Sequence, residues 1–217
     1  MIKLVAFLGN YGKEYAGTRH NVAWTFAEQL PFYDKLYFQQ KFKGDWASAD
    51  TSSLAQWFCD SQLLTTKDGG VPRVPEEAPP QIFFLKPLTY MNLSGESVGE
   101  LSRFYKIQSD EILVVHDELE LPLGTLSLKW SGGLGGHNGL RSMKATFGTA
   151  DFWRLRFGLT KPTNRDIADY VLSKFTEDEN IVLKTVFAQA NELLAKLLLA
   201  PDPQRLIPSW GKKKVTS

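Results

Sequence analysis

The fold follows from the stretch IKLVAFLGNYGKEYAGTRHN, residues 2–21, and from the segment after it. Residues 4–8 form a short apolar run that ends at a glycine, which is typical of a buried strand. Residues 9–21 contain three glycines and two asparagines, so they predict a sharply bent, polar connection. From Val22 onward, apolar residues recur at helical spacing. The stretch therefore predicts a strand, a polar loop and a helix.

Further strands and helices alternate along the chain. We predict strands over Phe42–Asp50, Gln56–Leu64, Ile82–Leu85, Ile112–Val115, Thr125–Trp130 and Trp153–Leu159, with a turn over Asp50–Ser53. We predict helices through residues 98–105, over about 140–147, from Asn164 to Leu172, and from a Thr176–Glu179 capping box to before Pro201. Strands followed by helices imply an α/β fold with a twisted, mixed, largely parallel β-sheet and helices on both faces.

The length of the chain predicts one domain, because 217 residues and 24.5 kDa suffice for a single buried core. We assign residues 1–200 to this domain and residues 201–217 to a basic C-terminal tail that we expect to be frayed. Residues 67–80 are rich in glycine and proline and predict an exposed loop.

The composition excludes several classes of protein. A net charge of +1 argues against strong bulk attraction to nucleic acid or anionic membrane, although a local basic patch is compatible with it. The single cysteine, Cys59, cannot form an internal disulfide and fits a reducing cytosol. The first apolar run is too short for a signal peptide, and no run approaches the roughly 20 residues that span a bilayer. We therefore expect a soluble, cytoplasmic protein.

His20 is the candidate catalytic base. Histidine is the only side chain whose unperturbed titration lies near neutral pH, so one in a polar loop can accept a proton from water. Thr18 is placed to cap the following helix, which puts His20 in its first turn, where backbone N–H dipoles disfavour a protonated ring. Asp117 follows a predicted strand and could orient His20 and stabilise its protonated form.

Several other side chains follow predicted strands. Sheets of this type place their sites outside the carboxyl ends of parallel strands, where Asn10, Asn92 and Asp117 are expected. With Asn138, the two asparagines could bind the carbonyl and hydroxyl groups of an ester or peptide. Asparagines in such loops are also common turn formers.

The alternatives concern the nucleophile and the metal. Cys59 is predicted to lie within a strand, away from the loops, and the His–Asp pair has no adjacent serine or cysteine, so direct activation of water is favoured. His116 and His137 are expected to have structural or supporting roles. A zinc site built from the three histidines is the rival interpretation, although no pair has the helical i, i+4 spacing of zinc ligands.

A phosphate site is also suggested by the sequence. Residues 132–136 hold four glycines, but the loop lacks the lysine and the spacing of a P-loop. Lys129 and Arg156 could clamp a phosphate beside this loop, although separated charges on strands are usually just solvated.

Taken together, these loops resemble the bacterial-type peptidyl-tRNA hydrolase family. The resemblance extends from the first strand to about Leu172, with the motifs in the same order and spacing. The matching stretches are residues 9–21, 86–95, 116–119 and 132–139. The sequence departs from the family at Tyr11, where proline is usual, at Phe7, where glycine is common, and in the longer segment 67–80.

The resemblance implies a hydrolase that cleaves the ester between a peptide and the 3′ ribose of tRNA. It implies that His20 activates water, that Asp117 keeps His20 basic, and that Asn10 senses the acylated amino group. The family's substrate-contacting positions correspond to Tyr15, Tyr90, Asn92 and Asn138, and its clamp for the 5′ phosphate to Lys129 and Arg156. It further implies no cofactor or metal, no partner besides peptidyl-tRNA, and a monomer. An inactive RNA-binding relative and a metal-dependent hydrolase are the alternatives.

Overall fold

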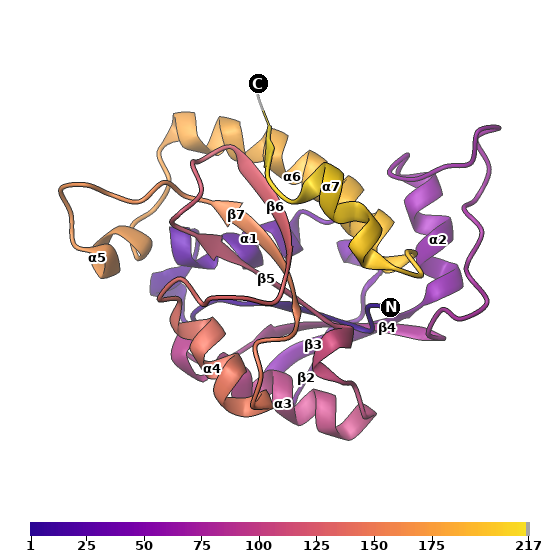
Figure 1. Ribbon diagram of the computed structural model, residues 1–217, viewed down its shortest axis with the longest axis horizontal. Coiled ribbons are helices and arrows are strands. Elements are labelled where there is room, and N and C mark those ends of the chain that lie inside the picture. The colour runs from indigo at the N-terminus through magenta and orange to yellow at the C-terminus, as the bar shows by residue number, and fades with distance from the viewer. Residues whose placement is uncertain (216–217) are drawn as a thin grey trace.

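Eight strands form one sheet in the computed structural model, which describes residues 1–215 (Figure 1). The strands are β1 (Leu4–Phe7), β2 (Gln39–Lys41), β3 (Gly44–Asp50), β4 (Gln81–Pro87), β5 (Ile112–Glu118), β6 (Thr125–Trp130), β7 (Trp153–Gly158) and β8 (Lys213–Lys214). The helices are α1 (Val22–Glu28), α2 (Thr51–Asp60), α3 (Ser94–Tyr105), α4 (Asn138–Phe147), α5 (Ile167–Val171), α6 (Glu177–Leu198) and α7 (Ile207–Trp210).

The middle of the sheet is parallel and its edges are antiparallel. The strand order is β2-β3-β4-β1-β5-β7-β6-β8. The neighbours β4, β1, β5 and β7 run parallel, whereas β2 and β3 on one side and β6 and β8 on the other pair antiparallel. The predicted α/β fold with a mixed sheet is therefore confirmed, and its central strands all end at the same edge.

Each face of the sheet has its own apolar core. In β1, Val5 and Phe7 pack on one face, while Leu4 and Ala6 pack on the other, as the alternation of side chains in a strand requires. Buried residues of α1, α2, α6 and α7 cover the first face, and those of α3 and α4 cover the second. The predicted layers of helices on both faces are thus confirmed.

Two predicted elements around residue 55 are wrong. Residues 51–60 form α2, so neither the strand over Gln56–Leu64 nor the turn over Asp50–Ser53 exists, and Cys59 lies in a helix. Leu54, Ala55 and Phe58 are buried together on one side of this helix. A short apolar segment fits both the two-residue alternation of a strand and the 3.6-residue repeat of a helix. Here packing against the sheet selects the helix.

The predicted strand over 42–50 begins two residues later than expected. Phe42 and Lys43 form the turn between β2 and β3, with φ angles of 56° and 51°. Two successive positive φ values are the geometry of a tight hairpin whose twist matches its strands. The edge strand β2 was missed because its residues are polar and exposed. Residues 67–80 form the expected loop without helix or strand.

The C-terminal segment is ordered rather than frayed. Residues 203–206 form a 3-10 turn, α7 follows, and β8 pairs with β6. Trp210 and Val215 are buried in the core of the first face, which explains why the segment packs. The expectation of a frayed tail is therefore wrong up to residue 215, while residues 216–217 lie outside the described part. The domain boundary at residue 200 stays a prediction.

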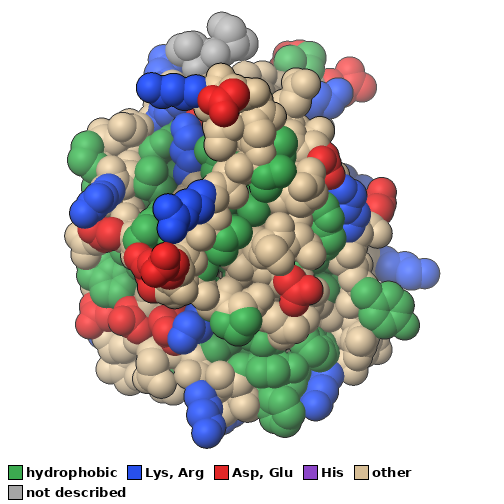
Figure 2. All heavy atoms as spheres, turned by 90° about the vertical axis from the view of Figure 1, so that its right-hand side faces the viewer, with side chains coloured by type: hydrophobic (Ala, Val, Ile, Leu, Met, Phe, Trp, Pro, Cys, Tyr) green, Lys and Arg blue, Asp and Glu red, His purple; other side chains and the backbone are tan. Residues whose placement is uncertain are grey.

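Within residues 1–215, no helix combines the length and the apolar character that crossing a membrane requires. Figure 2 shows the side of the molecule that carries α2. Basic and acidic side chains are intermixed there with apolar ones, and no described histidine is visible on it. The predicted catalytic residues lie elsewhere, at the edge of the sheet where the parallel strands end.

Phe26 of α1 tests the core of the first face. Its ring lies 5.1 Å from that of Phe157 in β7 and 5.5 Å from that of Phe187 in α6, measured between centroids. We expect Phe26→Ala to lower the free energy of unfolding by about 3–5 kcal/mol, because the cavity cannot collapse among rigid strands. Urea denaturation measures this loss. Ile181→Ala, at an exposed position of α6, is the control and should change stability by less than about 0.5 kcal/mol.

Candidate active site

A pocket of about 650 Å³ opens at the edge of the sheet where the parallel strands end. It is lined by residues after β1, at the end of β5, at the start of α4 and along α5. Asn10, His20, Asn92, Asp117 and Asn138, all predicted as site residues, are among its lining side chains. The topology thus brings together residues that are more than one hundred positions apart in the chain.

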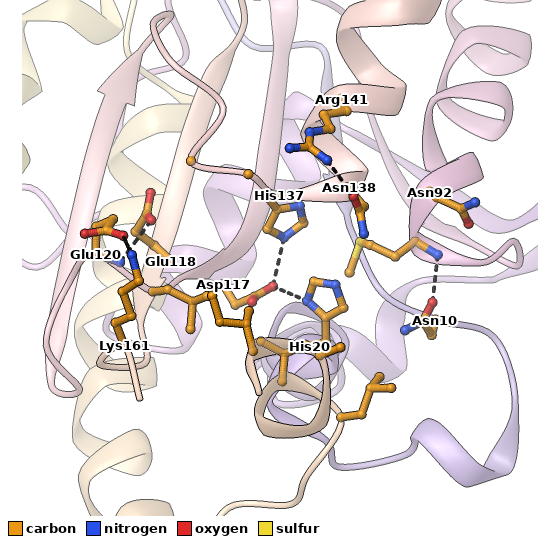
Figure 3. Close-up of a pocket in the computed structure, with 18 of the residues that line it drawn as sticks. Asn10, His20, Asn92, Asp117, Glu118, Glu120, His137, Asn138, Arg141 and Lys161 are labelled. Carbon is orange, nitrogen blue, oxygen red and sulfur yellow. Dashed lines mark hydrogen bonds and ion pairs between the residues drawn. The ribbon is translucent and has the colours of Figure 1, made fainter. Parts of the chain in front are cut away.

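Asp117 connects two histidines at the floor of this pocket (Figure 3). Its Oδ1 atom lies 2.9 Å from Nδ1 of His20 and 2.9 Å from Nε2 of His137. His20 belongs to a 3-10 turn over residues 19–21 that leads directly into α1, and His137 is the N-cap of α4. All three side chains are almost inaccessible to solvent, so the hydrogen bonds operate in a medium of low polarity.

The hydrogen bonds of His137 fix its tautomer. Its Nδ1 accepts the backbone N–H groups of Gly139, at 3.1 Å, and Leu140, at 3.4 Å. A ring nitrogen that accepts N–H groups carries no proton, so the proton of neutral His137 is on Nε2 and is donated to Asp117. From the sequence we expected a structural or supporting role for His137. Its direct hydrogen bond to Asp117 could not be predicted from the sequence.

The same logic orients His20. Because Asp117 is a carboxylate that only accepts, His20 donates from Nδ1 and keeps an unprotonated Nε2. Burial by itself would lower the pKa of His20, but the charge of Asp117 and its hydrogen bond outweigh burial and raise the pKa above 6.5. The expectation that helix dipoles keep the ring neutral is therefore incomplete, because Asp117 is the stronger influence.

Asp117 stays ionised in spite of its burial. Desolvation would raise its pKa, but the charges of His20 and His137 and the N–H groups that they donate hold the pKa well below the ordinary value. His116, the neighbour of Asp117, behaves in the opposite way. Its burial and the nearby His137 lower its pKa well below 6.5, and its Nδ1 donates to the backbone oxygen of Asp117 at 2.6 Å. His116 is thus a neutral, structural residue, as predicted.

Asn10 is locked in one orientation. Its side-chain oxygen accepts the backbone N–H of Met91 at 2.7 Å, which leaves its NH₂ group for the pocket. Its own backbone N–H and C=O pair with the side-chain amide of Asn21, at 2.8 and 2.9 Å. In the view of Figure 3, Asn10, Asn92 and Asn138 lie on one side of His20, and Glu118 and Glu120 on the other.

Tyr15 and Tyr90 lie beside one another outside this pocket. Their ring centroids are 6.3 Å apart with the planes nearly perpendicular, and Tyr90 is 55% exposed. Each tyrosine belongs to a loop that also supplies a lining residue, Asn10 in one case and Asn92 in the other. They form an aromatic pair beside the loops that carry Asn10 and Asn92.

Lys129 and Arg156 lie apart from the pocket, on β6 and β7. Arg156 donates to Glu118 at 3.2 Å and to Ser127 at 2.7 Å. Burial, followed by the charges of Arg156 and Arg154, lowers the pKa of Lys129. Positive charges therefore crowd this part of the sheet, a condition that an anion would relieve.

Arg154 supports the site from outside the pocket, and the sequence analysis did not single it out. It is 1% exposed and donates to the backbone oxygens of Gly133, at 2.6 Å, and Gly132, at 2.9 Å. It thereby fastens the glycine-rich loop that leads to His137. The proximity of Arg154 to this loop depends on the antiparallel pairing of β6 and β7, which the sequence does not reveal.

His20, Asp117 and His137 also satisfy a distance test for metal ligands. Their candidate ligand atoms lie within 4.8 Å of one another, and they form the one such group among residues 1–215. In the hydrogen-bonded arrangement, however, both histidine nitrogens that face Asp117 carry protons. A metal at this position would have to displace both protons.

Comparisons with known proteins relate the whole described chain to one family. Residues 4–215 match the family model described as peptidyl-tRNA hydrolase. A peptidyl-tRNA hydrolase of Treponema pallidum is 40% identical over 222 residues, covering 100% of this chain and 98% of that protein. One from Desulfitobacterium hafniense is 42% identical, covering 85% and 86%. The crystal structure of peptidyl-tRNA hydrolase from Acinetobacter baumannii superposes with a TM-score of 0.71 at 33% identity, covering 96% and 91%.

The raised pKa of His20 can be measured by NMR titration of its ring protons. We expect a value above 6.5 in the unmodified protein, and a value below 6.5 in Asp117→Asn. The substitution keeps an oxygen that accepts both N–H groups but removes the negative charge, so only the effect of burial remains. Retention of the native chemical shifts of α1 would show that the fold is unchanged. A His20 pKa at or below 6.5 before substitution would contradict the assigned electrostatics.

Proposed function

Because the chain belongs to the peptidyl-tRNA hydrolase family, we propose that it hydrolyses peptidyl-tRNA by activating water with His20. The bond to be cleaved is the ester between the peptide, or an N-blocked amino acid, and the 3′ ribose, and the reaction frees the tRNA for reuse. The observation that carries this proposal is the hydrogen bond between Asp117 and His20 at the floor of the pocket, because it leaves Nε2 of His20 free to accept a proton.

The chemical steps follow from this arrangement. Nε2 of His20 accepts a proton as the oxygen of water bonds to the ester carbonyl carbon, which gives a tetrahedral oxyanion. Asp117 stabilises the protonated ring through its charge, and the donated N–H of His137 holds Asp117 in place. Collapse of the intermediate breaks the bond to the 3′ oxygen, which takes the proton back from His20. The carboxylic acid of the peptide and the free ribose hydroxyl are the products.

The amide of Asn10 supports selection of acylated substrates. Its oxygen is occupied by the N–H of Met91, so it presents only N–H donors to the pocket. Such donors bind the carbonyl oxygen of an N-acyl group, whereas a free ammonium group offers no acceptor. Asn92 and Asn138 supply further amides for the ester and the ribose, and can stabilise the oxyanion.

The remaining predicted residues are assigned to the RNA. Tyr15 and Tyr90 present aromatic surface on the loops that carry Asn10 and Asn92, where an unpaired base of the 3′ end could stack. Lys129 and Arg156 form a clamp for the 5′ phosphate, in keeping with the crowding of positive charge around them. Action in the cytosol, by a monomer and without a cofactor, completes the proposal.

The removal of His20 tests the proposed base. We expect His20→Ala to lower kcat for release of the peptide from N-blocked aminoacyl-tRNA by roughly 10² or more, the usual effect of losing a general base. His20→Asn is the matched variant, because its amide can still donate to Asp117 but cannot accept the proton. Both variants should bind deacylated tRNA as the unmodified protein does. Turnover near the native rate in either one would show that the base is assigned incorrectly, and binding without turnover in the native protein would favour the RNA-binding alternative.

Treatment with a chelator tests the metal-dependent alternative, which the clustering of His20, Asp117 and His137 favours. We expect dialysis against EDTA to leave kcat unchanged within about two-fold, because the protonated nitrogens in the hydrogen-bonded network are not metal ligands. The measurement is the same hydrolysis assay before and after dialysis. Loss of activity that is restored by added Zn²⁺ would establish the metal-dependent reaction instead.

A further inference from the structure

The C-terminal strand β8 pairs with β6, and two exposed lysines lie at its ends, Lys212 directly before it and Lys214 within it. The ammonium of Lys213 lies 3.9 Å from the centroid of the Trp210 ring, and Val215 is buried in the same core. Both therefore point to the face that is covered by α6. Because side chains alternate along a strand, Lys214 points to the other face, and Lys212 lies in the bend that leads into β8.

That other face is the one that carries the proposed phosphate clamp. In β7 the residues Trp153, Leu155 and Phe157 belong to the core under α6, so Arg154 and Arg156 point away from it. The same alternation in β6 puts Lys129 on the side of Arg156. Three neighbouring strands thus present basic side chains on one side of the sheet.

Hydrogen bonds connect the clamp to the C-terminal segment. Arg156 donates to the hydroxyl of Ser127 at 2.7 Å, and this hydroxyl in turn donates to the backbone oxygen of Gly211. Gly211 directly precedes Lys212. The position of the C-terminal lysines relative to Arg156 is therefore set by a side-chain relay across β7, β6 and the start of β8.

The positive charge of this surface is largely uncompensated. Glu118 pairs with Arg156, but within residues 1–215 no carboxylate pairs with Lys129, Lys212 or Lys214. Adjacent strands are about 4.8 Å apart, so the lysines of β8 start about 10 Å from β7. Along β6, Lys214 pairs with Thr125, which is two residues from Ser127, the partner of Arg156. A lysine side chain bridges much of the distance from β8 to Arg156.

We propose that Lys212 and Lys214 extend the clamp of Lys129 and Arg156 and bind backbone phosphates of the tRNA substrate. The inference rests on the proposed function, and it assigns a role to the basic segment that the sequence left without one. A polyanionic strand is the partner that this surface fits, because successive phosphates can engage cations spread over three strands. Because the net charge of the whole chain is only +1, electrostatic attraction to RNA comes from this local patch rather than from the chain as a whole.

The test is the double variant Lys212→Gln/Lys214→Gln, assayed with N-blocked aminoacyl-tRNA and with an N-blocked aminoacyl-CCA trinucleotide. We expect KM for the tRNA to rise roughly 10-fold near 0.1 M salt, about 3-fold for each phosphate contact that is lost. The dependence of log KM on log salt should become shallower by about one for each lysine. KM for the trinucleotide, which has no helical stem to reach β8, should change less than two-fold.

The matched control is Lys67→Gln/Lys184→Gln, which removes the same charge from exposed positions in the loop after α2 and on α6. It should leave KM for the tRNA unchanged. An equal rise in the control would show an effect of net charge alone and would overturn the proposal. So would an unchanged KM for the tRNA in the test variant, or an equal rise for the trinucleotide.

Binding of deacylated tRNA, followed by fluorescence titration, separates this inference from the proposed reaction. If the native protein hydrolyses neither substrate, the proposed function fails. Weaker tRNA binding by the Lys212→Gln/Lys214→Gln variant, relative to the control, would still support the C-terminal contact. Equal binding by the two variants would overturn it, whatever the hydrolysis assay shows.

Discussion

The candidate active site depends on two hydrogen bonds to a single carboxylate oxygen. Oδ1 of Asp117 accepts N–H groups from His20, which leads into a helix on one face of the sheet, and from His137, which begins a helix on the other face. A buried charge is costly unless it is paired and hydrogen-bonded, and two donors offset that cost. The same contacts fix the tautomers of both rings, so packing and chemistry depend on one arrangement.

The parallel strands make this arrangement possible, and backbone contacts make it rigid. The strands β1, β4 and β5 end side by side, which brings the loops after them to one place. Asn10 then connects the loops directly, through its contacts with Asn21 and with the backbone of Met91. Because the orientation of its amide is determined by these contacts, its donors are preorganised for a ligand rather than ordered on binding.

The two ends of the proposed substrate meet different chemical surroundings. In the proposed complex, the acyl end contacts the neutral amides and the buried imidazole of the pocket. In the proposed complex, the phosphates contact arginine and lysine side chains on β7 and β6. Alternation along β7 separates its side chains, because Leu155 and Phe157 enter the core under α6 while Arg154 and Arg156 point to the opposite face of the sheet.

The sequence by itself determined the elements whose signals are local. The apolar runs at residues 4–8 and 112–115, the capping box at Thr176 and the polar loop around His20 all predict structure from neighbouring residues alone, and each is found. The resemblance of four loops also identified Asn10, His20 and Asp117 as residues that belong together. Their meeting in one pocket agrees with that identification.

Only the tertiary structure decided the rest, because it depends on partners distant in the chain. Residues 56–64 fit a strand or a helix, and contact with the sheet selected α2. The residues of β8 carry no strand pattern of their own, and β6 supplied their hydrogen bonds. His20 and His137 both donate to one oxygen of Asp117, and Arg154 donates to the glycine-rich loop. These hydrogen bonds join atoms that different strands and helices position. Spacing along a sequence does not encode such distances.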